Sequence, residues 1–254
     1  MSLDEVTKLE DFRAFCDRSQ RKCPPGYDDV TFEILRFLQT TQTVSNSEVP
    51  YTHARALEIM EKHYDWRQET FPMPQEKYAP FLESGFFYVH KRDKQYRPVM
   101  VLNLQRVGQL AKKATSENMM NLVYATMDFA AERLMIGGKI EQWSIIVDMK
   151  DASLTDKITF QIILLVMKAC LDYFPGRLYR MFIVNGGWTV STMLPAALYI
   201  ALDKMTTKRI AVCKEIPSLQ LIEHIGAPNL EEKYGGDRPN VAGGRFFPPD
   251  MSLD

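Results

Sequence analysis

Two hydrophobic periods divide the chain. In the first eighty residues apolar positions recur every three or four residues, as at Leu9, Phe12 and Phe15, which is the spacing of one helix face. Pro72 and Pro74 then interrupt the pattern. The sequence therefore predicts an N-terminal helical subdomain over residues 1–74 and a second domain over residues 75–254. The same helical period returns in two further stretches of the first part, at Val30, Ile34, Phe37 and Leu38 and at Leu57, Met60 and Tyr64.

From Phe86 onward, short runs of β-branched and aromatic residues replace the helical period. Helical patterns separate most of these runs, at residues 118–134, 158–173 and 219–225, the first of them behind Thr115 as a predicted cap. Strands that alternate with helices indicate an α/β fold, and a tight turn at 93–96 makes the roughly five-stranded sheet mixed. The predicted strands are 86–91, 98–104, 143–149, 178–185 and 209–213.

The stretch from Val184 to Leu202 is largely apolar and contains no charged residue. A helix that covers a core from solvent would show one polar face, so something apolar must cover both sides of this one. Periodicity alone favours a helix sandwiched in the core; the alternative is a lid over a lipid cavity. The stretch reaches only about the lower length limit of a membrane-spanning helix, so no transmembrane segment is expected.

Composition and charge narrow the class of protein. Hydrophobic residues make up 46% and charged residues 25% of the chain, as in folded globular domains. The net charge of −1 argues against a nucleic-acid partner, which would need a surplus of basic residues. The four cysteines have no regular spacing and the N-terminus lacks a signal pattern, so a cytoplasmic location is expected.

Motifs for catalysis are not found. The glycine pairs match neither a dinucleotide nor a phosphate loop, and no serine lies in GxSxG. The four histidines stand apart, so no metal site is predicted, and surface or capped histidines are expected. Asp148 ends a predicted buried strand, where a hydrogen-bonding role is favoured over catalysis. We assign no catalytic residue, metal ion or cofactor.

A series of motifs runs in order along almost the whole chain: ILRFLQ (34–39), HKRDKQYRPV (90–99), TSE and NLV (115–123), VDMK (147–150), YFPGRLYRMFIVN (173–185) and EEKYGG (231–236). The series resembles the CRAL-TRIO lipid-binding family. That family includes secretory phosphatidylinositol and phosphatidylcholine transfer proteins and the tocopherol and retinaldehyde carriers. The resemblance implies a helical N-terminal part, a sheet floor, and the apolar helix Thr189 to Leu202 as a gate over a lipid pocket.

The implied function is to bind one hydrophobic lipid in a closed pocket and to transfer or present it to membranes or to a lipid-modifying enzyme. Each methylene in water costs about 0.8 kcal/mol, so a bare acyl chain of about sixteen carbons would cost on the order of 13 kcal/mol. A closed apolar pocket removes most of that cost. The protein would associate only transiently with the membrane surface.

The resemblance carries over only part of the inositol head-group site. Basic residues of the phospholipid-transfer members correspond here to Thr41 and Gln42, and a glutamate corresponds to Gly176. Phosphatidylinositol or a phosphoinositide is one expected cargo, and a sterol-like or isoprenoid molecule is another. The head-group candidates that remain are Arg177, Asp203, Thr206 and Arg209.

Phosphatidylcholine is not an expected cargo. The family's hydroxyl-bearing choline contacts correspond here to Val89, Met100, Trp143 and Ile145, and a buried head group that loses a partner costs about 1–3 kcal/mol. Strand alternation places these side chains on one face with others. The predicted pocket lining is Val89, Met100, Leu102, Trp143, Ile145, Val147, Met181, Ile183, Leu194 and Ala197.

Three alternatives stay open at this point. The sheet face could be a filled core without a cavity, since packed interiors are the default. The fold could serve as a regulatory scaffold for protein interaction without cargo transfer, which the lost head-group residues would allow. An enzyme that uses Asp148 is the third alternative, and it lacks any nucleophile or cofactor loop.

Overall fold

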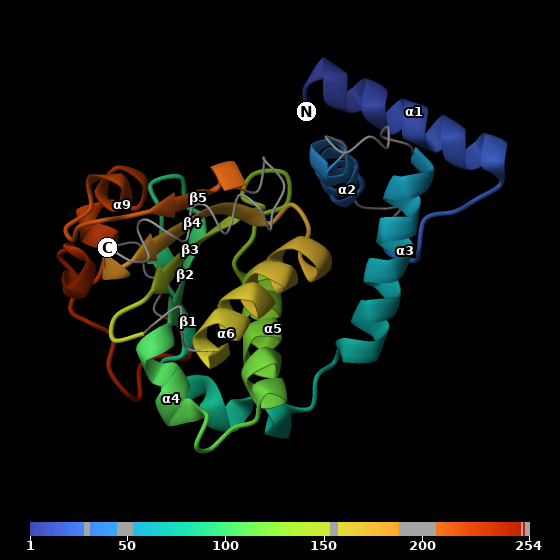
Figure 1. The fold of residues 1–254 in the computed structure, drawn as a ribbon. Helices are drawn as coiled ribbons and strands as arrows, with labels where there is room; N and C mark the ends of the chain where they lie inside the picture. Colours follow the sequence, from blue (N-terminus) through green and yellow to red (C-terminus); the bar gives the residue numbers. More distant parts are fainter. Residues whose placement is uncertain (28–30, 45–52, 153–156, 188–206, 250, 252–254) are drawn as a thin grey trace. The chain divides into compact units, whose positions relative to one another are not determined.

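The computed structural model describes residues 1–27, 31–44, 53–152, 157–187, 207–249 and 251 (Figure 1). Two compact units make up the chain. One comprises Met1–Pro72 together with Cys170–Gly176, and the other comprises Met73–Ala169 together with Arg177–Asp254. The short segment before the fourth strand therefore groups with the N-terminal helices, although it lies a hundred residues further along the chain.

The first unit is built from three helices: α1 (Leu3–Ser19), α2 (Thr31–Val44) and α3 (His53–Thr70). Helix α1 begins with a capping box, in which Ser2 and Glu5 each bond the other's backbone N–H. The three predicted helical stretches are thus present. Their apolar faces form one core of Leu9, Phe12, Tyr27, Ile34, Leu35, Phe37, Leu38, Ala56, Leu57 and Met60.

His63 joins this core to the 170–176 segment. Its Nδ1 meets the Tyr27 hydroxyl, and its Nε2 lies 3.0 Å from the Tyr173 carbonyl oxygen. Burial raises the pKa of Tyr27 to about 12. Trp66 stacks on the Tyr173 ring with centroids 4.6 Å apart. Of the two roles expected for the histidines, surface or capped, His63 does not have the first: it is 6% exposed, and its ring supplies the polar bridge that a buried carbonyl and hydroxyl need.

The second unit contains a five-stranded sheet of β1 (Phe87–Arg92), β2 (Pro98–Asn103), β3 (Trp143–Asp148), β4 (Leu178–Val184) and β5 (Ile210–Val212). The strands lie in the order β1-β2-β3-β4-β5. The first pair is antiparallel and the other three pairs are parallel. The predicted mixed α/β sheet is therefore confirmed.

Helices lie between β2 and β3 and between β3 and β4 in the sequence, and shorter ones precede β1 and follow β5. The long ones are α5 (Ser116–Arg133) and α6 (Lys157–Lys168), which lie side by side in Figure 1. Thr115 caps α5 through a reciprocal pair of bonds with Asn118, as its sequence position predicts. No helix in the described part of the chain is long and apolar enough to cross a bilayer. The shorter helices of this unit are η1 (Gln75–Lys77), η2 (Ala79–Ser84), η3 (Leu104–Arg106), α4 (Val107–Leu110), α9 (Leu219–His224), η5 (Ala227–Asn229) and η6 (Glu232–Tyr234). The helical turn η4 (Ala169–Tyr173) belongs to the first unit except for its first residue.

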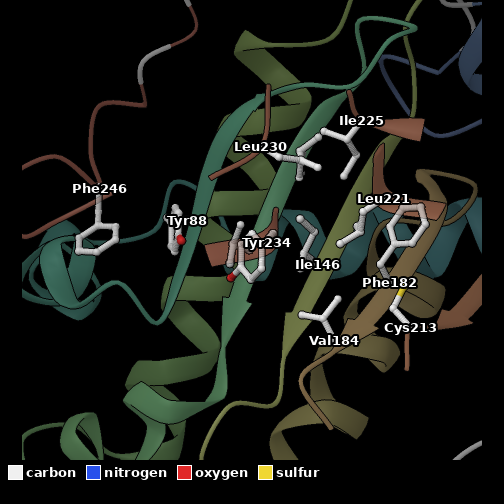
Figure 2. Packing of buried hydrophobic residues seen from close by; sticks show 12 residues of the cluster. Tyr88, Ile146, Phe182, Val184, Cys213, Leu221, Ile225, Leu230, Tyr234 and Phe246 are labelled. Atoms are coloured by element: carbon white, nitrogen blue, oxygen red, sulfur yellow. The ribbon is translucent and has the colours of Figure 1, made fainter. Parts of the chain in front are cut away.

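One face of the sheet is covered by the C-terminal segment. Its central row crosses four strands in register, from Tyr88 to Val101, Ile146 and Phe182. Figure 2 shows side chains of this face against those of the C-terminal segment. We call this cluster the C-terminal core; its buried members are Tyr88, Val99, Val101, Ile146, Phe182, Val184, Cys213, Leu221, Ile225, Leu230, Tyr234 and Phe246.

Candidate functional site

The opposite face of the sheet carries two apolar rows in register. In the first row Val89 pairs with Met100, Met100 with Ile145, and Ile145 with Met181. In the second row Leu102 pairs with Val147, and Val147 with Ile183. Because side chains alternate along a strand, both rows point away from the C-terminal core. Together with Trp143 at the start of β3, they form a surface that we call the apolar face.

The apolar face offers hydrocarbon, thioether and indole groups, without a hydroxyl or a charge. Val89 is 5% exposed, and the other seven residues are 0% exposed. The structure therefore brings together eight of the ten residues predicted to line a pocket. The other two, Leu194 and Ala197, lie outside the described residues, as does the predicted gate over 189–202. That the eight residues line a lipid cavity stays a prediction.

Two arginines lie where strands β3, β4 and β5 begin. Arg177 is buried, and its Nη1 donates to the Glu141 carbonyl oxygen at 3.1 Å. Arg209 is half-buried, and its Nη1 donates to the Leu178 carbonyl oxygen at 2.6 Å. Since Leu178 follows Arg177, both guanidinium groups are held near the same end of β4. The other two head-group candidates, Asp203 and Thr206, lie outside the described residues.

The positive charge of Arg209 is not neutralised by a carboxylate among the described residues. Within the described ranges its guanidinium makes no ion pair with a carboxylate, and its one bond is to a neutral backbone oxygen. An arginine held by a carbonyl retains a full positive charge and several free N–H donors in a planar fork. Such a group suits a phosphate.

Gly176 departs from the family's glutamate for a structural reason. It lies in the left-handed region, with φ of +73°, where glycine is favoured. A Cβ at this position would lie 2.7 Å from Cγ of Arg36 and 3.0 Å from Oγ1 of Thr40. The Arg36 guanidinium in turn donates to the Pro175 carbonyl oxygen and pairs with Glu33. The local packing thus leaves no room for a longer side chain.

A buried hydrogen-bond network at the carboxyl end of β3 was missed by sequence reasoning. Asp148 accepts three hydrogen bonds, from the Tyr234 hydroxyl at 3.0 Å, from Nδ2 of Asn185 at 2.8 Å and from the backbone N–H of Lys150 at 3.1 Å. These bonds give Asp148 the hydrogen-bonding role that its position predicts. Through these bonds Asp148 links β3 to the residue that follows β4 and to the C-terminal segment.

The network continues through a second carboxylate. The Tyr88 hydroxyl donates to Oε2 of Glu231 at 2.9 Å, and Lys233 lies 3.2 Å from Oε1 of the same side chain. Burial raises the pKa of Tyr88 and of Tyr234 well above the ordinary value, so both stay protonated donors. The sequence feature that could have indicated this network is the EEKYGG motif, because it contains Glu231, Lys233 and Tyr234.

His90 is the second histidine that does not lie at the surface. It is 8% exposed on β1, and its Nε2 has no hydrogen-bond partner among the described residues. Burial lowers the pKa of its imidazole, against an opposing influence of Glu231. The ring is therefore neutral in the folded chain at physiological pH.

Comparison with known proteins agrees with this architecture. The sequence model of the CRAL/TRIO domain matches residues 82–236, which include every strand of the sheet. The Sec14 cytosolic factor of Schizosaccharomyces pombe is 30% identical over 227 residues, which cover 83% of this chain and 75% of that protein. A phosphatidylinositol/phosphatidylcholine transfer protein of Arabidopsis thaliana is 26% identical over 84% of this chain and 38% of its own length.

The SEC14 cytosolic factor of Yarrowia lipolytica is 28% identical over 86% of this chain, which spans 46% of that protein. Among solved structures, the crystal structure of Sfh5 superposes with a TM-score of 0.65 over 95% of this chain and 91% of that one. At 15% identity that likeness concerns the fold alone. The match of the domain model over residues 82–236 and the relative at 30% identity show that this chain belongs to the CRAL/TRIO domain family.

Proposed function

We propose that this protein binds a single lipid, with its acyl part against the apolar face, and transfers or presents that lipid to membranes. One observation carries the proposal: two cross-strand rows of a five-stranded sheet present only apolar groups on the face away from the C-terminal core. Relatives named as transfer proteins support it. Burial of the lipid's acyl chain against these rows would stabilise the complex by about 25 cal/mol for each Å² of apolar surface removed from water.

Phosphatidylinositol or a phosphoinositide is the cargo that the residues favour. Arg177 and Arg209 lie near the same end of β4, and a phosphate between them would gain charge-assisted hydrogen bonds. A choline head group would instead meet Val89, Met100, Trp143 and Ile145, which have no hydroxyl to offer. The proposed selectivity therefore depends on an anionic head group at the β4 end and on few polar contacts elsewhere.

The proposed role is carriage, without chemistry on the lipid. The three hydrogen bonds that Asp148 accepts fit a structural role for the carboxylate at the end of β3. The proposal requires no metal ion or cofactor. Relatives named cytosolic factors support a cytoplasmic carrier that meets membranes transiently, where a lipid-modifying enzyme could receive the cargo.

Transfer of labelled phosphatidylinositol between two vesicle populations tests the proposal. The wild-type protein should accelerate transfer, and Arg209→Ala should slow it because the phosphate loses a charged partner. Removal of one charged hydrogen bond costs about 1.5–3 kcal/mol, which is a loss of about tenfold or more in affinity. Arg245→Ala, which removes an equal charge from an exposed position, should leave transfer unchanged. Transfer no faster than without protein would contradict the proposal and favour a scaffold without cargo.

A further inference from the structure

Two hairpin tips lie together at the end of the sheet where β1 ends and β3 begins. The first tip, residues 93–97, joins β1 to β2, and the second, residues 134–141, leads toward β3. Nη1 of Arg92 donates to the Tyr96 carbonyl oxygen at 2.7 Å and to the Leu134 carbonyl oxygen at 3.0 Å. One guanidinium nitrogen therefore ties the two tips to each other.

The first tip is held in one shape by Asp93. Oδ1 of Asp93 accepts from the backbone N–H of Gln95 and of Arg97, each at 2.9 Å, and Oδ2 accepts from Nε of Arg97 at 2.8 Å. Asp93 is 2% exposed, whereas Lys94, Gln95 and Tyr96 are exposed. Tyr96 is 58% exposed, with φ of +63°. The buried carboxylate thus organises a turn that presents a large aromatic side chain to solvent.

The second tip presents an aliphatic side chain in the same way. Ile136 and Ile140 exchange two backbone hydrogen bonds, of 2.9 and 2.8 Å, around a turn that contains Gly137 and Gly138. Gly138 has φ of +72°, which the turn requires. Ile136 is 49% exposed, and Lys139 beside it is also exposed. Each tip therefore combines one exposed apolar group with a neighbouring lysine.

Basic side chains outnumber acidic ones on the two tips and the residues that flank them. Lys94, Arg133 and Lys139 are exposed, and within the described ranges none of them makes an ion pair. Among the described residues, the Arg92 guanidinium donates to the backbone oxygens of Tyr96 and Leu134. The acidic side chains of the same segments are Asp93, which pairs with Arg97, and Glu132 and Glu141, of which Glu141 accepts from the Gly138 N–H at 3.0 Å.

We propose that these tips dock the protein on an anionic membrane surface. Tyr96 and Ile136 would enter the interfacial layer, where aromatic and aliphatic groups are favoured, while Lys94, Arg133 and Lys139 would meet lipid phosphates. Exposed apolar side chains beside exposed basic ones are the combination that favours an anionic lipid surface. The proposal rests on the proposed function, since it gives the carrier a place to meet the bilayer that it serves.

Sedimentation with vesicles of phosphatidylcholine alone, or with added phosphatidylserine, tests this surface. The wild-type protein should bind the anionic vesicles and lose that binding in high salt. Lys94→Glu with Lys139→Glu should weaken binding to the anionic vesicles by at least about tenfold. Each basic residue near the membrane surface attracts anionic lipid, and the two substitutions replace two such residues with acidic ones that the surface repels. Tyr96→Ser with Ile136→Ser should weaken binding too, and the residual binding should be fully salt-sensitive.

Matched controls exist elsewhere on the same unit. Lys112→Glu with Lys113→Glu makes the same change in net charge at exposed positions just after α4, and Leu219→Ser removes a 76% exposed apolar side chain at the start of α9. Both should bind vesicles like wild type. Wild-type binding by the tip variants, equal loss in the controls, or no vesicle binding by the wild-type protein would each overturn the proposal.

Mass spectrometry of bound lipid separates this proposal from the function on which it rests. Tip variants that retain their native lipid but no longer sediment with vesicles support both. A protein that sediments through its tips but never carries lipid would overturn the carrier function and leave the docking surface standing. Circular dichroism confirms that each variant is folded, as expected for changes at exposed side chains.

Discussion

The Tyr234 hydroxyl donates to Oδ2 of Asp148 across 3.0 Å, which joins η6 to the carboxyl end of β3. Both side chains are buried, at 0% and 3% exposure. Asp148 also accepts from Asn185, the residue that follows β4. The C-terminal segment is therefore fixed by a polar bond as well as by its apolar contacts, and the bond positions the chain where two strands end.

Tyr234→Phe should lower the stability of the protein. The phenylalanine keeps the ring in the C-terminal core but leaves a buried carboxylate oxygen short of a donor, at a cost of about 1–3 kcal/mol. Urea unfolding measures the change in free energy. Tyr96→Phe removes a hydroxyl from a 58% exposed side chain and should change stability by less than about 0.5 kcal/mol. Equal stability of the two variants would show that the buried bond contributes nothing.

Gly176→Ala should destabilise the first unit more than a glycine replacement in open space. Both Gly176 and Gly26 have positive φ, so alanine is strained at either position by about 1 kcal/mol. Only at Gly176 does the new Cβ also meet Arg36, at 2.7 Å, whereas nothing lies within 4 Å of a Cβ at Gly26. The midpoint temperature of thermal unfolding should therefore be lower for Gly176→Ala than for Gly26→Ala. The reverse order would contradict the packing around Gly176.

The protein should lose stability as the pH falls below about 6.5, partly through His90. Burial lowers the pKa of the folded imidazole below its ordinary value of 6.5, so below that pH the unfolded chain binds a proton that the folded chain does not. The contribution of His90 to the free energy of unfolding is therefore complete above pH 6.5, and it is lost as the pH falls from 6.5 to the lower pKa of the folded protein. His90→Gln stays neutral, and its urea-unfolding free energy should change less between pH 7 and pH 5. An unaltered pH slope would mean that His90 does not contribute.

Phosphatidylcholine should be transferred more slowly than phosphatidylinositol. The four positions that would contact choline offer no hydroxyl, and each missing partner costs about 1–3 kcal/mol for a buried polar head group. Parallel vesicle assays with each labelled lipid measure the two rates. Equal rates would mean that the head group is held by contacts other than those on the apolar face and at Arg177 and Arg209.

Most of the sheet could be predicted from the sequence. Short runs rich in β-branched and aromatic residues favour strands over helices, so all five strands were found, with ends within a residue of the observed ones. The Thr115 cap was predictable because its hydrogen bonds are local. Strand alternation also placed eight predicted pocket residues on one face, and the observed register agrees.

Contacts between distant residues could not be predicted in the same way. Tyr88 and Glu231 are 143 residues apart, and nothing local in either segment encodes their bond. The burial of His63 and His90 likewise depends on tertiary neighbours. The adjacency of the tips at 93–97 and 134–141 follows from strand order and from Arg92, whose side-chain direction the sequence does not reveal.

Extraction of native lipid from freshly purified, detergent-free protein tests the central claim most directly. Organic solvent releases any bound lipid, and mass spectrometry identifies and quantifies it against the protein. The account predicts about one lipid per chain, with an inositol phospholipid enriched over phosphatidylcholine relative to the host membrane. Protein that is folded and carries no lipid would contradict the account.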